Sequence, residues 1–126
     1  MERERVRAII IQRKKVLLVT SEGAAKFWTP GGHQEGDETY RETMERELME
    51  ELNLRLVAME PITSLDSGKG KGRSFYYLCE VRGEPRPSSE ISEFRWVTFR
   101  EFEESHAASN ERLLKVLRML HAKRLL

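Results

Sequence analysis

The sequence predicts an α/β fold in which a mixed β-sheet is packed between helices. Apolar segments of strand type stand both before and after a helical segment at 40–52, and a leucine-rich segment with helical spacing closes the chain. Strands on both sides of one helix, followed by a C-terminal helix, favour a sheet that is covered by helices on two faces. The chain has no repeat, linker or shift in composition, so one domain is expected over residues 1–126.

The expected strands and loops alternate in short segments. Runs of aliphatic, β-branched and aromatic residues bounded by turn residues predict each strand. Before the helix, the strand-like segments are 6–11, 16–19 and 26–29. After it, they are 54–58, 61–65, 74–81 and 95–97, with loops at 66–73 and 83–89. Pro61 indicates an edge strand, and helical turns are expected at 99–104, before a final helix that Asn110 caps.

The helix at 40–52 has clear local signals. Thr39 and Glu42 have the spacing of a capping box, which predicts a helix that runs from there to about Leu52. At about 100° per residue, four apolar residues fall on one stripe that would face the core. They are Tyr40, Met44, Leu48 and Leu52.

Three glutamates lie at the edge of this stripe, namely Glu47, Glu50 and Glu51. Anions within one helical turn repel one another, and partial burial raises the cost. A hard divalent cation with oxygen ligands removes both penalties, which indicates magnesium or manganese. Taken alone, a Glu-x-x-Glu-Glu segment is more often a solvated helix face. The surrounding pattern therefore decides between the two interpretations.

The spacing around these glutamates is specific. From Gly32 the chain reads Gly, five residues, Glu38, seven residues, and then Arg46-Glu47-Leu48-Met49-Glu50-Glu51-Leu52-Asn53-Leu54. This closely resembles the Nudix box, G-x5-E-x7-R-E-U-x-E-E-x-G-U, in which U is a bulky aliphatic residue. Every specified position matches except the last glycine, where this chain has Asn53. Because Asn is the next best residue after Gly for a left-handed helix end, the departure keeps the expected backbone geometry.

The resemblance implies the α/β/α sandwich of the Nudix family and a site for Mg²⁺, with Mn²⁺ as an alternative. The implied metal ligands on the helix are Glu47, Glu51 and Glu50, and one of these glutamates would also help to deprotonate the attacking water. The carbonyl of Gly31 would be a further ligand. Arg46 and Glu38 resemble the orienting pair of the box, because the rigid fork of an arginine can hold a carboxylate.

Other residues are expected to reach the site from outside the helix. The family supplies a late glutamate, and Glu90 or Glu93, on the loop before the last strand, resembles it. We favour Glu90 as the ligand, and the alternative is that either residue is a solvated loop charge. The candidates for substrate contact are Gly32, Glu93, Lys69, Lys71 and Arg73. The three cations could instead be a solvated hairpin tip, and Trp28, Tyr76 and Trp96 could stack a base or simply pack.

The charge and composition of the chain limit the kinds of partner and the cellular compartment that are expected. Lys and Arg number 22 against 21 Asp and Glu, a formal net charge of +1, which gives no electrostatic case for nucleic acid or a membrane. The N-terminal residues contain no apolar run long enough for a signal peptide or a membrane span. The single cysteine, Cys79, excludes an internal disulfide and fits a reducing compartment. A cytoplasmic monomer or homodimer is expected.

The resemblance implies hydrolysis of a nucleoside diphosphate linked to another group X, which releases a nucleoside monophosphate and phosphorylated X, or pyrophosphate. Two subgroup signatures of the family, a proline or a tyrosine about sixteen to eighteen positions after the box, are missing, because Lys69, Gly70 and Lys71 stand there. The short chain favours a nucleoside triphosphate or a related nucleotide as substrate. The alternative is a non-catalytic module that binds or senses a nucleotide, but such a module could do without the three glutamates.

Overall fold

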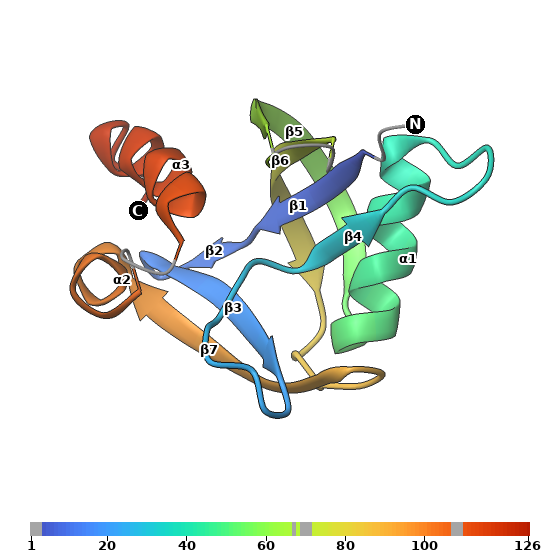
Figure 1. Ribbon diagram of the computed structural model, residues 1–126, viewed down its shortest axis with the longest axis horizontal. Helices are drawn as coiled ribbons and strands as arrows, with labels where there is room; N and C mark the ends of the chain where they lie inside the picture. The colour runs from blue at the N-terminus through green and yellow to red at the C-terminus, as the bar shows by residue number, and fades with distance from the viewer. Residues whose placement is uncertain (1–3, 67, 69–71, 107–109) are drawn as a thin grey trace.

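The computed structural model describes residues 4–66, 68, 72–106 and 110–126, which form seven strands and three helices (Figure 1). The strands before the first helix are β1 (Arg5–Ile9), β2 (Ile11–Gln12), β3 (Lys15–Ser21) and β4 (Gly31–His33). The strands after it are β5 (Arg55–Asp66), β6 (Arg73–Arg82) and β7 (Ile91–Thr98). The helices are α1 (Tyr40–Leu52), α2 (Phe99–Ser105) and α3 (Glu111–Ala122).

The predicted α/β fold with sheet between helices is confirmed, but the strands form two sheets. The first has the order β4-β1-β6-β5, in which β1 and β6 are parallel and the other pairs are antiparallel. The second is antiparallel and has the order β2-β3-β7. In Figure 1, α1 lies on one side of the strands, and α2 and α3 lie on the other.

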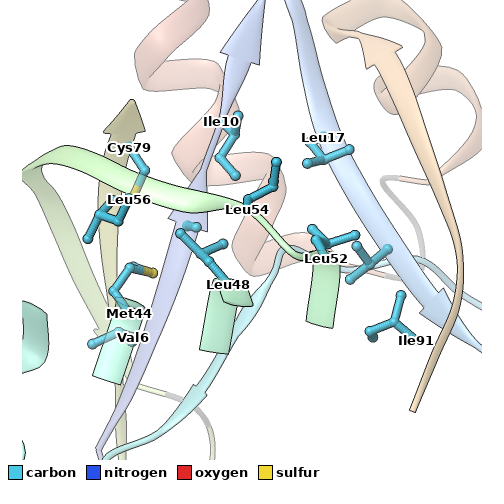
Figure 2. Packing of buried hydrophobic residues seen from close by; sticks show 12 residues of the cluster. Val6, Ile10, Leu17, Met44, Leu48, Leu52, Leu54, Leu56, Cys79 and Ile91 are labelled. Atoms are coloured by element: carbon cyan, nitrogen blue, oxygen red, sulfur yellow. The ribbon is translucent and has the colours of Figure 1, made fainter. Parts of the chain in front are cut away.

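Two apolar cores lie between these layers. The first joins the buried stripe of α1 to strands of both sheets. Figure 2 shows Met44 near Leu56, Leu48 near Leu54, and Leu52 on the side of Leu17 and Ile91. The second joins the opposite face of the strands to α2 and α3, chiefly through Phe102 and the leucines of α3. Since each helix buries an apolar stripe against the strands, burial fixes which side of α1 faces inward. The position of its glutamates follows from that orientation.

Several strands differ from those expected. The segment 26–29 is not a strand and makes only an isolated bridge, between Trp28 and Val19, whereas β4 was not expected. The segment 6–11 is divided between β1 and β2 at Ile10, because the chain passes there from one sheet to the other. The segments 54–58 and 61–65 form the single strand β5, whose register shifts between Pro61 and Thr63. The proline is tolerated because β5 is an edge strand, as the sequence indicated. The last strand is Ile91–Thr98 instead of 95–97, since β3 provides a partner along its whole length.

Both ends of α1 are as the sequence predicts. The Thr39 hydroxyl accepts a hydrogen bond from the Glu42 amide at 3.1 Å, and the Glu42 carboxylate accepts one from the Thr39 amide at 2.8 Å. Asn53 ends the helix in the left-handed region, with φ 56° and ψ 34°. Its side-chain amide also donates to the Arg86 carbonyl at 3.1 Å and to the Ser88 hydroxyl at 3.3 Å. Asn53 therefore joins the end of α1 to the segment that leads to β7.

In the described part of the chain, none of the helices is both long enough and apolar enough to cross a membrane.

Substitutions at Asn53 separate the two contributions of this residue. Asn53→Gly keeps the left-handed backbone but removes both side-chain hydrogen bonds, so we expect a loss of about 1 kcal/mol in the free energy of unfolding. Asn53→Val removes the bonds and also strains the backbone, which should cost about 3 kcal/mol. Urea unfolding measures both values. A glycine variant more stable than the wild type would show that the side-chain bonds contribute nothing.

Candidate active site

The packing of α1 sorts its three candidate glutamates by exposure. Leu48 and Leu52 are fully buried on the inner face of the helix. Beside them, the Glu51 residue is only 4% exposed and the Glu47 side chain 15%, whereas the Glu50 side chain is 52% exposed. The helix therefore turns two carboxylates inward and leaves the third in contact with solvent.

Arg46 is the centre of a hydrogen-bond network among the acidic residues. Its guanidinium donates to both oxygens of Glu38, at 2.7 and 3.0 Å, and to the His33 carbonyl at 3.0 Å. The same group donates to Glu47 at 2.7 Å and to Glu50 at 3.3 Å. The hydrogen bond from Arg46 lowers the pKa of Glu38 to about 2. Arg46 thus ties the loop before α1 to the outer side of the glutamate cluster.

Two glycines let the chain approach these carboxylates closely. The Gly31 amide donates to Glu51 Oε2 at 3.2 Å. A Cβ on Gly31, whose φ is +136°, would lie 2.0 Å from the Val6 carbonyl oxygen, because β4 pairs with β1 at this point. A Cβ on Gly32 would lie 2.6 Å from the carboxyl carbon of Glu47. Any larger residue at Gly32 would therefore displace a carboxylate from the site.

Glu47 and Glu51 form a pair of like charges with little access to solvent. Burial, followed by the nearby carboxylate of Glu47, raises the pKa of Glu51 to about 9, and the Gly31 amide and Arg7 oppose this only in part. Among the described residues, no three acidic, histidine or cysteine side chains converge in the geometry of a metal site. Two adjacent carboxylates, one of them disfavoured as an anion, nevertheless fit a hard divalent cation, which would restore the charged form of both.

The late glutamates occupy different settings. The prediction that both lie on a loop is wrong for Glu93, which belongs to β7 and pairs with Thr20 of β3. The Glu93 carboxylate accepts a hydrogen bond from Arg95 at 3.1 Å. Glu90 is exposed in the turn just before β7. The preceding segment is bonded to the end of α1, since the Ser88 amide donates to the Glu51 carbonyl at 2.9 Å and the Ser88 hydroxyl donates to the Glu50 carbonyl.

Of the three predicted substrate cations, Arg73 alone belongs to the described residues, and none of its contacts among those residues is with the box. Lys69 and Lys71 lie outside the described residues. Arg73 begins β6, and its guanidinium donates to the hydroxyl and the carbonyl of Ser64 at 3.3 and 3.2 Å. It is therefore engaged with the neighbouring strand.

Sequence reasoning missed a group of cations at a separate polar pocket, namely Arg5, Arg7, Lys26 and Arg112. Trp28 and Tyr76, two of the aromatic candidates, line the same pocket. The alternation Arg5-Val6-Arg7 in a strand was the available signal, because it places both arginines on the same face of β1.

The fold and this acidic helix define the class of protein. A model of the NUDIX domain matches residues 1–117, and the chain belongs to the Nudix family. Nudix hydrolases generally use divalent metal ions. The comparison with curated proteins gives no match.

Solved structures support the same fold. A NUDIX hydrolase from Nitrosomonas europaea has a TM-score of 0.82 and 22% identity, over 98% of this chain and 90% of that one. A structure from a study of MutT from Aliivibrio salmonicida and Vibrio cholerae has a TM-score of 0.79 and 18% identity, over 94% and 99%. An ADP-ribose pyrophosphatase from Streptococcus suis has a TM-score of 0.70 and 25% identity, over 79% and 76%.

The Arg46–Glu38 contact predicts a defined acid response. Since the Glu38 pKa is about 2 in the folded state against an ordinary 4.5, its contribution to stability is present above pH 4.5 and is lost as the pH falls towards 2. In Arg46→Gln the pKa of Glu38 should return towards its ordinary value. The free energy of unfolding of the variant should then decline less between pH 4.5 and 2 than that of the wild type.

Urea unfolding at a series of pH values, with EDTA present, measures this decline. Arg41→Gln is the matched control, because Arg41 is an exposed arginine of the same helix that pairs with Glu45. If Arg46→Gln and the wild type lose stability equally steeply in acid, Arg46 is not the cause of the low pKa of Glu38.

Proposed function

We propose that this protein is a divalent-metal-dependent hydrolase that cleaves a phosphoanhydride bond in a nucleoside diphosphate linked to another group. The observation that carries the proposal is the inward-facing pair Glu47 and Glu51, with the glycine amide of Gly31 bonded to one of them at 3.2 Å. Membership of the Nudix family makes a pyrophosphatase-type enzyme the expected class. We also propose that it acts in the cytoplasm.

Each residue of the site has a role in this proposal. Glu47 and Glu51 would hold the cation, with the carbonyl of Gly31 and the carboxylate of Glu90 as further ligands. When bound, the metal would neutralise negative charge on the phosphates and lower the pKa of a bound water. Arg46 keeps Glu47 in position through the 2.7 Å contact and is itself fixed by Glu38. Glu50 is exposed to solvent, which suits a carboxylate that accepts the proton of the attacking water.

The substrate proposed is a nucleoside triphosphate or a related nucleotide. One similar structure is named a MutT protein and another an ADP-ribose pyrophosphatase, so the relatives span more than one nucleotide class. The release of phosphate and pyrophosphate across a panel of nucleoside triphosphates, oxidised triphosphates and nucleotide sugars, with Mg²⁺ and then Mn²⁺, tests the proposal. Binding without any turnover across the panel would favour the alternative, a nucleotide-sensing module.

Glu51→Gln should separate stability from function. Because the pKa of Glu51 is raised from 4.5 to about 9, this residue lowers the free energy of unfolding above pH 4.5, and the loss grows until the pH reaches about 9. Gln removes this cost, so the metal-free variant should melt at a higher temperature than the wild type at pH 8. Turnover should fall by roughly 100- to 10,000-fold, and added Mg²⁺ should stabilise the variant less than the wild type.

Thermal melts in EDTA and in MgCl₂, together with initial rates, measure these effects. Glu45→Gln is the control, because Glu45 is exposed on the same helix and should leave rates and metal response unchanged. A fully active Glu51→Gln enzyme would place the chemistry elsewhere.

The late glutamate is tested by Glu90→Gln and Glu93→Gln. A ligand on a turn is held less firmly than one on a helix, so Glu90→Gln should lower turnover by roughly 10- to 1000-fold, which corresponds to about 1.4 to 4 kcal/mol of barrier. Glu93→Gln should have a smaller effect, because Arg95 already binds that carboxylate. Initial rates of the two variants measure this. A larger loss of turnover in Glu93→Gln would make Glu93, on β7, the late metal ligand. No loss in either variant would limit the metal ligands to α1 and Gly31.

A further inference from the structure

An apolar pocket of about 520 Å³ lies between the sheet strands β2, β5 and β6 and the C-terminal residue Leu125. Leu125 is 44% exposed, so part of this apolar surface faces solvent. The pocket shares no residue with the candidate active site. Apart from two glutamates, its lining residues are Ile11, Ala58, Met59, Leu78, Cys79 and Leu125.

The two glutamates give the pocket a negative charge. Glu60 of β5 and Glu80 of β6 are both exposed. Ala58 stands opposite Glu80, and Glu60 stands opposite Leu78, so both carboxylates project from the same face of the sheet. Among the described residues, neither belongs to an ion pair within 4.0 Å, and the pocket lining contains no cation. A complementary partner must therefore bring an apolar group together with positive charge.

The outer face of α3 has this combination. Met119 is 39% exposed on that helix. Lys115 and Lys123 lie four residues before and after it, which places all three side chains along one face. Both lysines are exposed, and in the part of the chain that the structure describes neither belongs to an ion pair within 4.0 Å. The outer face of α3 is thus apolar at its centre and positive on both sides.

The pocket and the outer face of α3 both adjoin the C-terminal end of this helix. The Lys123 amide donates to the Met119 carbonyl at 3.2 Å, and the Leu125 amide donates to the Leu120 carbonyl at 3.0 Å. In Figure 1 the C-terminus lies beside α3. Met119 does not line the pocket of its own chain. Because the two surfaces adjoin, two copies related by a two-fold axis can each place α3 on the pocket of the other.

A second copy accounts for more of these observations than a small ligand does. A cationic amphiphile would match the volume and charge of the pocket, but it would leave the exposed methionine of α3 between its two lysines in solvent. A second copy covers both surfaces at once. The formal net charge of the chain is only +1, so two copies repel each other weakly. Methionine is also flexible enough to fill an irregular apolar pocket.

We propose that this pocket binds the outer face of α3 of a second copy of the chain, and that the two copies form a two-fold homodimer. Met119 of each copy enters the pocket of the other, and Lys115 and Lys123 lie against the carboxylates of Glu60 and Glu80. The dimer makes this contact twice. The inference does not depend on the proposed function, since neither surface contains a residue of the candidate active site.

Sedimentation equilibrium of the full chain tests the apolar part of the contact. From about 1 to 500 μM protein, the wild type should change from monomer to dimer. Met119→Ala should raise the dissociation constant of the dimer by at least about 10-fold, because it removes buried apolar area at both contacts. Met49→Ala is the matched control, since Met49 is an exposed methionine of α1, and its dissociation constant should equal that of the wild type. A wild type that is monomeric throughout, or an unchanged constant in Met119→Ala, would overturn the proposal.

An exchange of charges identifies the partner of the pocket. One double variant is Glu60→Lys with Glu80→Lys, and the other is Lys115→Glu with Lys123→Glu. Each alone should be monomeric over the same concentrations, because like charges then face each other at both contacts. All four residues are exposed, and circular dichroism measures whether each variant is folded.

An equimolar mixture of the two double variants should form a one-to-one dimer. In the mixture, the positive pocket of one variant meets the negative helix face of the other, and the second contact joins the negative pocket to the positive helix face. A mixture that stays monomeric would overturn the proposal, and so would dimerisation of either double variant alone with the affinity of the wild type. A pocket for a small cationic ligand predicts the first of these two results.

Discussion

The close approach of two carboxylates with little access to solvent, those of Glu47 and Glu51, is the constraint on which the rest of the site depends. An isolated pair of like charges in this position would be removed by rotation of either side chain into solvent. The packing of Leu48 and Leu52 prevents α1 from rotating, and Arg46 holds the outer side of Glu47 at 2.7 Å. Gly31 and Gly32 then bring the backbone against both carboxylates, where no other residue would fit.

The proximity of these two carboxylates is by itself unfavourable, and the rest of the fold compensates for its cost in free energy. The raised pKa of Glu51 is the sign of this, because the folded state favours a proton there at neutral pH. Protein stability is a small difference between large terms, so a fold can tolerate one such local cost when its cores are well packed. The two cores on either side of the strands supply that tolerance. A divalent cation would convert the cost into binding energy.

Local signals made α1 predictable, whereas pairing in the sheets was not. The capping box at Thr39 and the left-handed end at Asn53 depend on neighbours within a few residues, and both were anticipated with the correct bounds. The division of 6–11 at Ile10 and the early start of β7 depend on partners far away in sequence. For the same reason, Glu93 was assigned to a loop although β3 extends the strand to include it.

The residues of the candidate site also separate into those that local sequence signals predict and those that only the tertiary structure reveals. Glu38, Arg46 and the three glutamates could be named from spacing, because a helix converts spacing into position. The pocket lined by Arg5, Arg7, Lys26 and Arg112 could not be predicted from the sequence. Its cations come together only through the parallel pairing of β1 with β6 and the packing of α3. An Arg-Val-Arg alternation alone is compatible with any exposed strand.

The acidic site and the cationic pocket are linked by Arg7. This arginine interacts favourably with Glu51 and Glu47, and at the same time it lines the pocket opposite Gly31. A cation bound between the carboxylates would cancel part of the negative field that stabilises Arg7. The electrostatic environment of Arg7 and the binding of a cation would therefore be coupled, and linkage requires the coupling to have the same size in both directions.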